Sequence, residues 1–461
     1  MQKDLEIIDS EYKDLLFNDI PIFYSYTDTS DVFDSRGKKI RNYYETTGLK
    51  KSIDIISNLS EKLIQRQMGL LMMNLDIFVN SELKKNELRS FNFLREAENI
   101  ALALWESKFQ LNDDLSFTTV ISILDQRYGV TAINSSLYEG LSGVALFFLE
   151  LYLVTRKEKY FLYYQKILKN AIRKTKDQKL IMSAYYGILS QLFPLLLEVK
   201  ALKNQKATVK IKKLISLVAN YEFKDSIRID WLTGLAGVLG IISEVYWILK
   251  IKEALKVADL LFQKLSTELE HSNKNELNEH GIAHGLAGLA LALAKYYRIK
   301  PSVSLKKKII NLLEKEMTIY QTKEQSWRFC CKNTGMLSVR LYINDIIQHS
   351  KIKAQIAILI NQKNKGLENW PKDDSLCHGN AGIIYSLFKY QDYDKKISNI
   401  VSEGVRNLLK NRYCKGNYDL QKIPGFVTKG VFTGVAGVGL TLLQLSNSGV
   451  NNNLLLLDIN F

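Results

Sequence analysis

The sequence predicts an all-α protein in which seven helix-hairpin repeats form an α/α toroid, preceded by a mostly helical N-terminal segment. Two observations predict this fold class. The 461 residues include only five prolines and 25 glycines among long runs rich in Leu, Ile and Lys, so few breakers are available to separate many short strands. A glycine-rich motif also recurs at nearly constant spacing, as in repeat architectures.

The repeat is a short Gly-x-x-Gly element that is followed each time by an apolar run. Five clear copies and two degenerate ones end at Gly143, Ser190, Gly237, Gly288, Gly335, Gly382 and Gly437. Successive copies are separated by 47, 47, 51, 47, 47 and 55 residues. A period near 47 residues fits two helices and two loops, so each repeat is predicted to be a helix hairpin.

The two helices of each predicted hairpin differ in character. Residues 144–149 and 289–294, which follow the motif, are almost wholly apolar and are predicted to be buried on most sides. Residues 251–261 instead show an apolar stripe of helical period with charges opposite, as expected for an outer helix. The last copy ends in the apolar run 440–445, which favours a closed ring over an open solenoid with polar caps.

The motif glycines are predicted to be structural, because they allow a sharp turn and a close approach between helices. Since each turn begins an inner helix, the side chains that decorate the turns are expected to gather at one mouth of the ring. Helix N-termini at this mouth would favour anions.

Composition excludes several classes of function. The net charge of +15 comes from 63 basic and 48 acidic residues, but the lysines are spread along helices without a polybasic block, so no nucleic-acid partner is predicted. The acidic N-terminus does not resemble a signal peptide. No apolar run reaches the ~20 residues of a transmembrane helix, so a cytoplasmic location is expected. Four cysteines in such a chain suit metal ligands or reactive thiols better than a disulfide framework.

Four residues capable of metal or acid–base chemistry occupy two positions of the repeat. Cys330 and Cys377 precede the last residue of their copies by five, and His284 and His378 precede it by four. The fifth and sixth repeats are neighbours, so Cys330, Cys377 and His378 can converge. Three such ligands with an open fourth position are typical of catalytic zinc. Buried thiols beside a capping histidine are the alternative.

His284 and Asp230 lie in the two preceding repeats. A histidine with an ordinary pKa of about 6.5 can act as a general acid or base, although a lone histidine at a helix start is more often a packed or hydrogen-bonding residue. Asp230 could orient or pair with a catalytic group, or could be an ordinary aspartate near a helix N-terminus.

Three of these motifs together resemble the lanthionine synthetase C-like cyclase family. They are Asp230-x-x-x-Gly-x-Ala-Gly, Gly-Ile-Ala-His-Gly-Leu-Ala-Gly at 281–288 and Cys-His-Gly-Asn-Ala-Gly at 377–382. The resemblance covers residues 116–461, and residues 136–147 are most similar to the cyclase half of class II bifunctional lanthipeptide synthetases. Residues 19–31 are similar to the closing segment of their dehydratase module, so residues 1–115 are expected to be the end of such a module in a split or truncated synthetase.

The resemblance implies a function and a set of roles. Zn²⁺ would be held by Cys330, Cys377 and His378 and would lower the pKa of a peptide cysteine thiol. The thiolate would add to dehydroalanine or dehydrobutyrine in the same ribosomal precursor peptide, closing a lanthionine or methyllanthionine ring. By the same resemblance His284 would protonate the resulting enolate, and Asp230 would be the active-site aspartate. A separately encoded dehydratase is an expected partner.

The segment around Cys330 departs from the family pattern. Cys331 follows directly, so two cysteines are candidates for one ligand position, and the 47-residue spacing to Cys377 favours Cys330. Lys332 stands where the family has glycine, and we expect it to distort the turn or to place a positive charge near the zinc.

Two other functions are open on the sequence. A non-catalytic scaffold would bind a precursor peptide or a separate dehydratase, and the basic charge would suit an acidic leader. A toroidal sugar-processing enzyme would need two carboxylates at the mouth. The turns offer Glu139 and Asp230, which lie two repeats apart, so this function ranks last.

Overall fold

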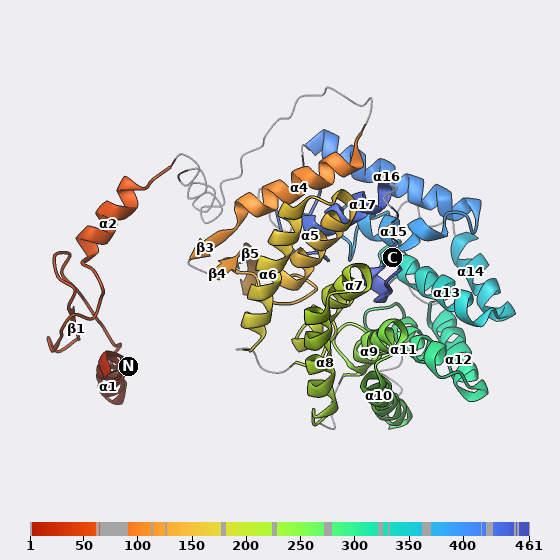
Figure 1. Ribbon diagram of the computed structural model, residues 1–461, viewed down its shortest axis with the longest axis horizontal. Coiled ribbons are helices and arrows are strands. Elements are labelled where there is room, and N and C mark those ends of the chain that lie inside the picture. Colours follow the sequence, from red (N-terminus) through yellow and green to blue (C-terminus); the bar gives the residue numbers. More distant parts are fainter. Residues whose placement is uncertain are drawn as a thin grey trace. The chain divides into compact units, whose positions relative to one another are not determined.

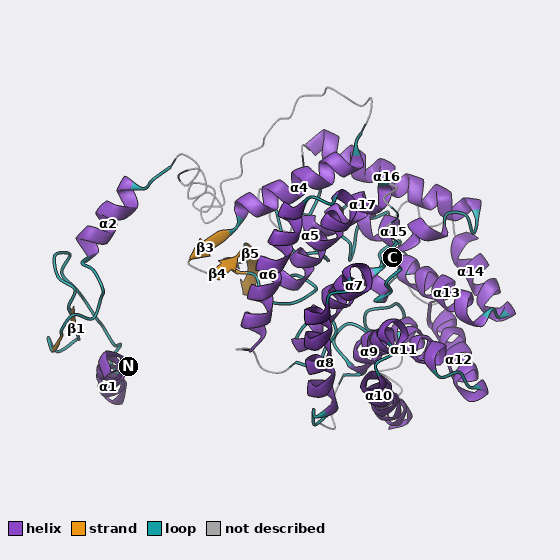
Figure 2. Cartoon of the chain, viewed as in Figure 1, coloured by secondary structure: helices purple, strands orange, loops and turns teal. Residues whose placement is uncertain are grey.

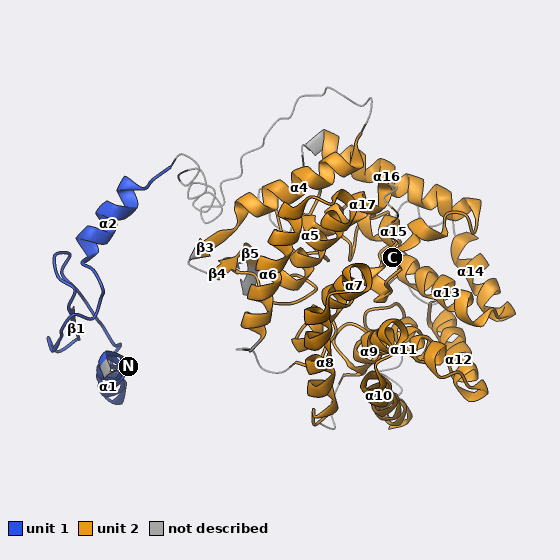
Figure 3. Cartoon of the chain, in the orientation of Figure 1, with its two compact units in different colours: residues 1–79 blue, residues 80–461 orange. Residues whose placement is uncertain are grey.

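The structure, a computed structural model, separates into two compact units, residues 1–79 and 80–461 (Figure 3). The residues that it describes are 2–60, 64, 91–111, 114–124, 127–176, 181–223, 228–271, 279–320, 326–330, 332–361, 370–415, 417–420, 427–446, 449 and 451–460. No helix among these residues is both long and apolar enough to span a membrane.

Within residues 2–60, the described part of the first unit has two helices and a small hairpin. Helix α1 (Gln2–Leu16) precedes the antiparallel strands β1 (Val32–Phe33) and β2 (Lys39–Ile40), and α2 (Gly48–Ser57) follows. Helix α1 is tied to the hairpin through two carboxylates. Asp34 accepts a hydrogen bond of 2.7 Å from the Ser10 hydroxyl, and Asp14 pairs with Arg36 at 2.6 Å. Helices α1 and α2 supply 15 and 10 residues of the range 2–60, so this range is less helical than the sequence predicts.

The second unit is built of helices with two short hairpins near its start (Figure 2). In chain order its elements are α4 (Phe93–Ser107), β3 (Phe109–Leu111), β4 (Asp114–Ser116), β5 (Thr118–Leu124), β6 (Arg127–Ala132), α5 (Leu141–Thr155), α6 (Glu158–Lys176), η1 (Ile188–Gln191), α7 (Leu192–Leu202), α8 (Gln205–Ala219), α9 (Leu235–Leu249), α10 (Lys252–His271), α11 (Leu286–Ile299), α12 (Val303–Tyr320), α13 (Asn333–Ile347), α14 (Ser350–Asn361), α15 (Asn380–Leu387), η3 (Phe388–Tyr390), α16 (Lys395–Lys415), α17 (Val435–Leu445) and η4 (Leu454–Leu456). Strand β3 pairs with β4 and β5 pairs with β6, both antiparallel.

The helices form a closed double ring, which confirms the predicted α/α toroid (Figure 1). Helices α5, α7, α9, α11, α13, α15 and α17 are almost wholly buried, and each packs against the next, with α17 returning to α5. Helices α6, α8, α10, α12, α14 and α16 bury one face against them. The apolar runs therefore lie inside and the amphipathic ones outside, as hydrophobic burial requires.

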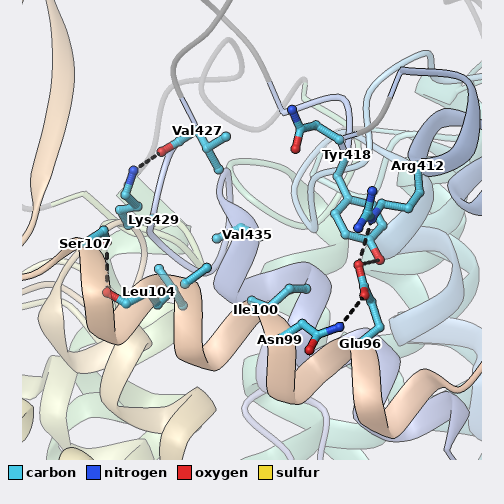
Figure 4. Close-up of a pocket in the computed structure, with 12 residues that line it drawn as sticks. Glu96, Asn99, Ile100, Leu104, Ser107, Arg412, Tyr418, Val427, Lys429 and Val435 are labelled. Atoms are coloured by element: carbon cyan, nitrogen blue, oxygen red, sulfur yellow. Dashed lines mark hydrogen bonds and ion pairs between the residues drawn. The ribbon is translucent and has the colours of Figure 1, made fainter. Parts of the chain in front are cut away.

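Helix α4 completes the outer layer by packing on α17. It is fixed at one end by Glu96, which accepts hydrogen bonds from Arg412 at 2.7 Å and from the Tyr418 hydroxyl at 3.4 Å (Figure 4). A cavity of about 300 Å³ remains between α4 and the start of α17. The compact unit that holds the ring thus includes residues 93–107, ahead of the boundary at residue 116 that the sequence motifs suggest.

The glycine that ends a motif copy is required because a backbone carbonyl lies where a Cβ would be. A Cβ at Gly237 would lie 2.1 Å from the carbonyl oxygen of Trp231, and one at Gly382 would lie 2.1 Å from that of Leu376. Gly143, Gly288, Gly335 and Gly437 face the carbonyl six residues earlier in the same way. These contacts explain why the glycine recurs in each of these turns.

A closed cycle of hydrogen bonds joins the seven turns. Its members are the residues five before the end of each motif copy: Tyr138, Tyr185, Leu232, Ala283, Cys330, Cys377 and Phe432. Except at Tyr185, the N–H of each donates to the carbonyl of the next around the ring at 2.9–3.3 Å, and Phe432 returns to Tyr138. At the step from Tyr185 to Leu232 the Ser183 hydroxyl stands between them, accepting from the Tyr185 N–H and donating to the Leu232 carbonyl.

The C-terminal segment lies inside the ring, where Figure 1 marks the end of the chain. Leu454, Leu455, Leu456 and Leu457 are all buried. Their carbonyls are satisfied by inner-helix and turn side chains: the Tyr185 hydroxyl donates to Leu455 at 3.2 Å and the Lys295 ammonium donates to Leu457 at 2.9 Å. The middle of the toroid is therefore filled by the chain itself.

Replacing the bridging serine tests the cycle. Ser183→Ala removes the acceptor for the Tyr185 and Tyr186 N–H groups and the donor to the Leu232 carbonyl, so we expect a loss of about 2 kcal/mol of unfolding free energy in urea. The matched control is Ser338→Ala, an equally buried serine with a single 3.3 Å bond to the Ser386 carbonyl. Equal losses in the two variants would contradict a special role for Ser183.

Candidate functional site

Three side chains that could hold a metal ion converge at the mouth of the ring. Cys330 precedes α13, and Cys377 and His378 precede α15. The Cys330 N–H donates to the Cys377 carbonyl at 3.3 Å, so the cycle places the two cysteines side by side. One ligand atom from each of the three residues lies within 4.8 Å of the other two.

This donor set fits zinc. Zinc–sulfur and zinc–nitrogen bonds near 2.3 and 2.0 Å in a tetrahedral site put neighbouring ligand atoms roughly 3.5–3.8 Å apart, which small side-chain adjustments can reach from 4.8 Å. Cys377 is buried, whereas Cys330 and His378 are partly exposed. Partial exposure on one side leaves a direction from which a fourth ligand can enter.

Tyr138 is a contact of this cluster that the sequence analysis did not single out. Its hydroxyl donates to the Cys377 Sγ at 2.9 Å, across 239 positions of sequence. The signal that could have found it is its place in the repeat, because Tyr138 occupies the same position before the motif's end as Cys330 and Cys377.

Asp230 and His284 form a second pair at the same mouth. The Asp230 Oδ2 lies 3.2 Å from the His284 Nδ1, and Asp230 also accepts from the Thr233 N–H at 2.6 Å and the Thr233 hydroxyl at 2.8 Å. The turns that carry them are joined by the Leu232 N–H to Ala283 carbonyl bond. The structure thus favours pairing for Asp230 among the alternatives that the sequence left open.

The pair shifts both pKa values. Burial by itself would raise the pKa of Asp230, but the hydrogen bonds from His284 and Thr233 outweigh it and hold that pKa below its usual range. The hydrogen bond to Asp230 raises the pKa of His284 against the smaller, opposing effect of partial burial. The His284 side chain is 46% exposed, so it can reach a substrate at the mouth.

The turn that carries Lys332 keeps the shape of its neighbours. Lys332 caps α13 with φ −138° and ψ −160°, close to the φ −119° and ψ −168° of Gly379 before α15. The expected distortion is therefore wrong, because this extended backbone is open to any residue. Cys331 lies outside the described residues, so the choice between it and Cys330 rests on the convergence of Cys330 with Cys377 and His378.

Glu139, the other carboxylate considered at the mouth, is engaged by the ring closure. It accepts from the Thr433 hydroxyl at 2.9 Å. This contact ties the first repeat to the last.

Comparisons with known proteins identify the family. The sequence model of the lanthionine synthetase C-like proteins matches residues 131–456, well over half of the chain. The chain belongs to the lanthionine synthetase C-like family. The solved structure of nisin cyclase is similar at 18% identity with a TM-score of 0.54, covering 70% of this chain and 92% of that one, which supports the fold.

A curated relative extends the comparison. The chain is 26% identical over 358 residues to the lacticin 481/lactococcin biosynthesis protein LcnDR2 of Lactococcus lactis subsp. lactis. The match covers 69% of this chain and 37% of that protein, so this member of the family spans little more than a third of the length of its curated relative.

The Asp230–His284 pair can be tested by titration. We expect Asp230→Asn to lower the pKa of His284, measured from its ring-proton NMR shifts, because the largest cause of the raised pKa is removed. Glu279→Gln is the matched control, since Glu279 acts on His284 only through its charge and should give a smaller decrease. An unchanged pKa in Asp230→Asn would contradict the pairing.

The same shift fixes the sign of a stability effect. Because His284 has a higher pKa in the folded chain than in the unfolded one, its contribution to stability is complete below about pH 6.5 and is lost as the pH rises through the folded value. In Asp230→Asn this part of the pH dependence of unfolding should disappear.

Proposed function

We propose that this protein is a zinc-dependent lanthipeptide cyclase, in which Cys330, Cys377 and His378 hold Zn²⁺ and His284, oriented by Asp230, handles protons. The observation that supports the proposal most directly is the convergence of two thiols and an imidazole from adjacent turns. A bound zinc ion would lower the pKa of a peptide cysteine thiol and supply the thiolate nucleophile.

The chain's own residues would then complete the addition. The peptide sulfur forms a bond to the β-carbon of dehydroalanine or dehydrobutyrine, and the electron pair of the carbon–carbon double bond moves to the α-carbon as an enolate. His284 donates its proton to the α-carbon and is reprotonated by the equivalent of the proton that the thiol released, so the addition changes neither the proton balance nor the oxidation state. Asp230 holds the His284 Nδ1 at 3.2 Å, which leaves the other ring nitrogen to face the substrate.

The proposed substrate is a ribosomal precursor peptide that has already been dehydrated, since the addition needs a dehydroamino acid. A dehydratase must therefore act first, either as a separate partner or as another part of a longer chain. The net charge of +15 would attract an acidic leader segment during encounter.

Metal content is the first test. We expect about one zinc per purified chain by elemental mass spectrometry, as one three-ligand site implies, and loss of that zinc in Cys330→Ala, Cys377→Ala and His378→Ala. Cys331→Ala is the matched control and should retain zinc. Zinc lost with Cys331 and retained without Cys330 would reassign the ligand.

Catalysis is tested with His284→Gln on a dehydrated peptide. We expect ring closure to slow by about 100-fold or more, because general acid catalysis contributes on that scale, while the zinc content stays unchanged. His349→Gln, a substitution at the start of α14, is the matched control and should leave the rate unchanged. Loss of metal in His284→Gln would instead make His284 a ligand.

A binding scaffold is the outcome if the unmodified chain captures a precursor peptide yet holds no zinc and closes no ring. In that case the function of the protein would be to bind the peptide, not to catalyse ring closure.

A further inference from the structure

A buried tyrosine hydroxyl contacts one of the candidate metal ligands from outside the ligand set. The Tyr138 hydroxyl lies 2.9 Å from the Cys377 Sγ, and the two residues are only 8% and 3% exposed. The contact is therefore shielded from water, and the sulfur depends on protein groups for its hydrogen bonds.

The position of Tyr138 is fixed by its neighbours. Its ring stacks on Phe432 with centroids 4.4 Å apart and packs against Tyr186 at 4.9 Å. Its carbonyl accepts from the Phe432 N–H at 3.0 Å. Both the backbone and the ring are thus held, so the hydroxyl is aimed at the sulfur at little further entropic cost.

The chemistry of a ligand sulfur sets the direction of this hydrogen bond. A cysteine that ligates a metal is a thiolate without a proton, so the phenol must be the donor. Such a bond draws electron density from the sulfur, partly offsets its negative charge in a buried place, and fixes the direction of the side chain.

We propose that Tyr138 is a positioning residue of the candidate metal centre, whose hydroxyl holds the Cys377 Sγ in ligating geometry and weakens its electron donation to the metal. This inference rests on the proposed zinc site and adds a residue to it. Because Tyr138 comes from the first repeat and Cys377 from the sixth, the contact also makes the metal centre depend on closure of the ring.

The test uses the metal itself as the probe, with the full chain. Tyr138→Phe keeps the ring and its stacking but removes the O–H. We expect the affinity for zinc to fall by about 10- to 100-fold in a chelator competition. With Co²⁺ in place of zinc, the sulfur-to-cobalt charge-transfer band should move to lower energy, since a sulfur without its hydrogen bond gives up electrons more easily.

Tyr185→Phe is the matched control. Tyr185 occupies the same position of the second repeat, and its hydroxyl is bonded to the Leu455 carbonyl and the Trp231 indole. Both variants lose a buried hydroxyl, so both can lose stability, but only Tyr138→Phe should shift the cobalt band.

Three results would overturn the proposal. An unshifted band and unchanged affinity in Tyr138→Phe would remove Tyr138 from the centre while leaving the cyclase function standing. Equal shifts in both variants would assign the effect to general loosening of the ring. Failure of the unmodified chain to bind cobalt or zinc would defeat the metal site, and the proposal with it.

Discussion

The closed cycle of hydrogen bonds at the mouth is the constraint on which the rest of the structure depends. Neighbouring turns are joined by backbone N–H to carbonyl bonds, with the Ser183 hydroxyl as the bridge at one step, so the seven turns are held in one annulus. The glycine that ends the motif makes room for the carbonyl six residues earlier, since a Cβ at Gly335 would lie 2.1 Å from the Phe329 carbonyl oxygen. Because the backbone is fixed in this way, the chemistry of the mouth depends on which side chains occupy the equivalent positions of the seven turns.

The opposite end of the ring is organised by a second register of polar residues. The tenth position from the start of an inner helix carries a polar side chain that contacts the C-terminal segment in five cases. They are Glu150 to Asn452, Glu244 to Ile459, Lys295 to Leu457, Lys389 to Asp458 and Gln444 to Asn452. Buried charges such as Lys295 and Glu244, which pair at 2.8 Å, are thereby compensated as burial requires.

The repeat spacing was enough to predict the toroid, its inner and outer helices and the convergence of Cys330, Cys377 and His378. The apolar period sets which helices are buried, and the common register sets which turns align. The packing of α4 on α17 could not be predicted from the sequence, because a single amphipathic helix at 93–107 carries no motif that marks it as the partner of α17. The contact of Tyr138 with Cys377 needed knowledge of where the ring closes.

The Asp230–His284 pair and the contact between Tyr138 and Cys377 differ in how they depend on closure of the ring. The Asp230–His284 pair lies on adjacent repeats whose turns are bonded directly, so it needs only local structure. The Cys377 sulfur is contacted by Tyr138, which reaches it only because Phe432 of the last repeat bonds to both Tyr138 and Cys377. Separation of α17 from α5 would therefore remove the Tyr138 hydroxyl from Cys377 first. The adjacent turns that carry Cys330 and Cys377, like those that carry Asp230 and His284, would keep their direct bonds. The hydrogen bond from Tyr138 to a candidate metal ligand thus forms only when the ring is closed.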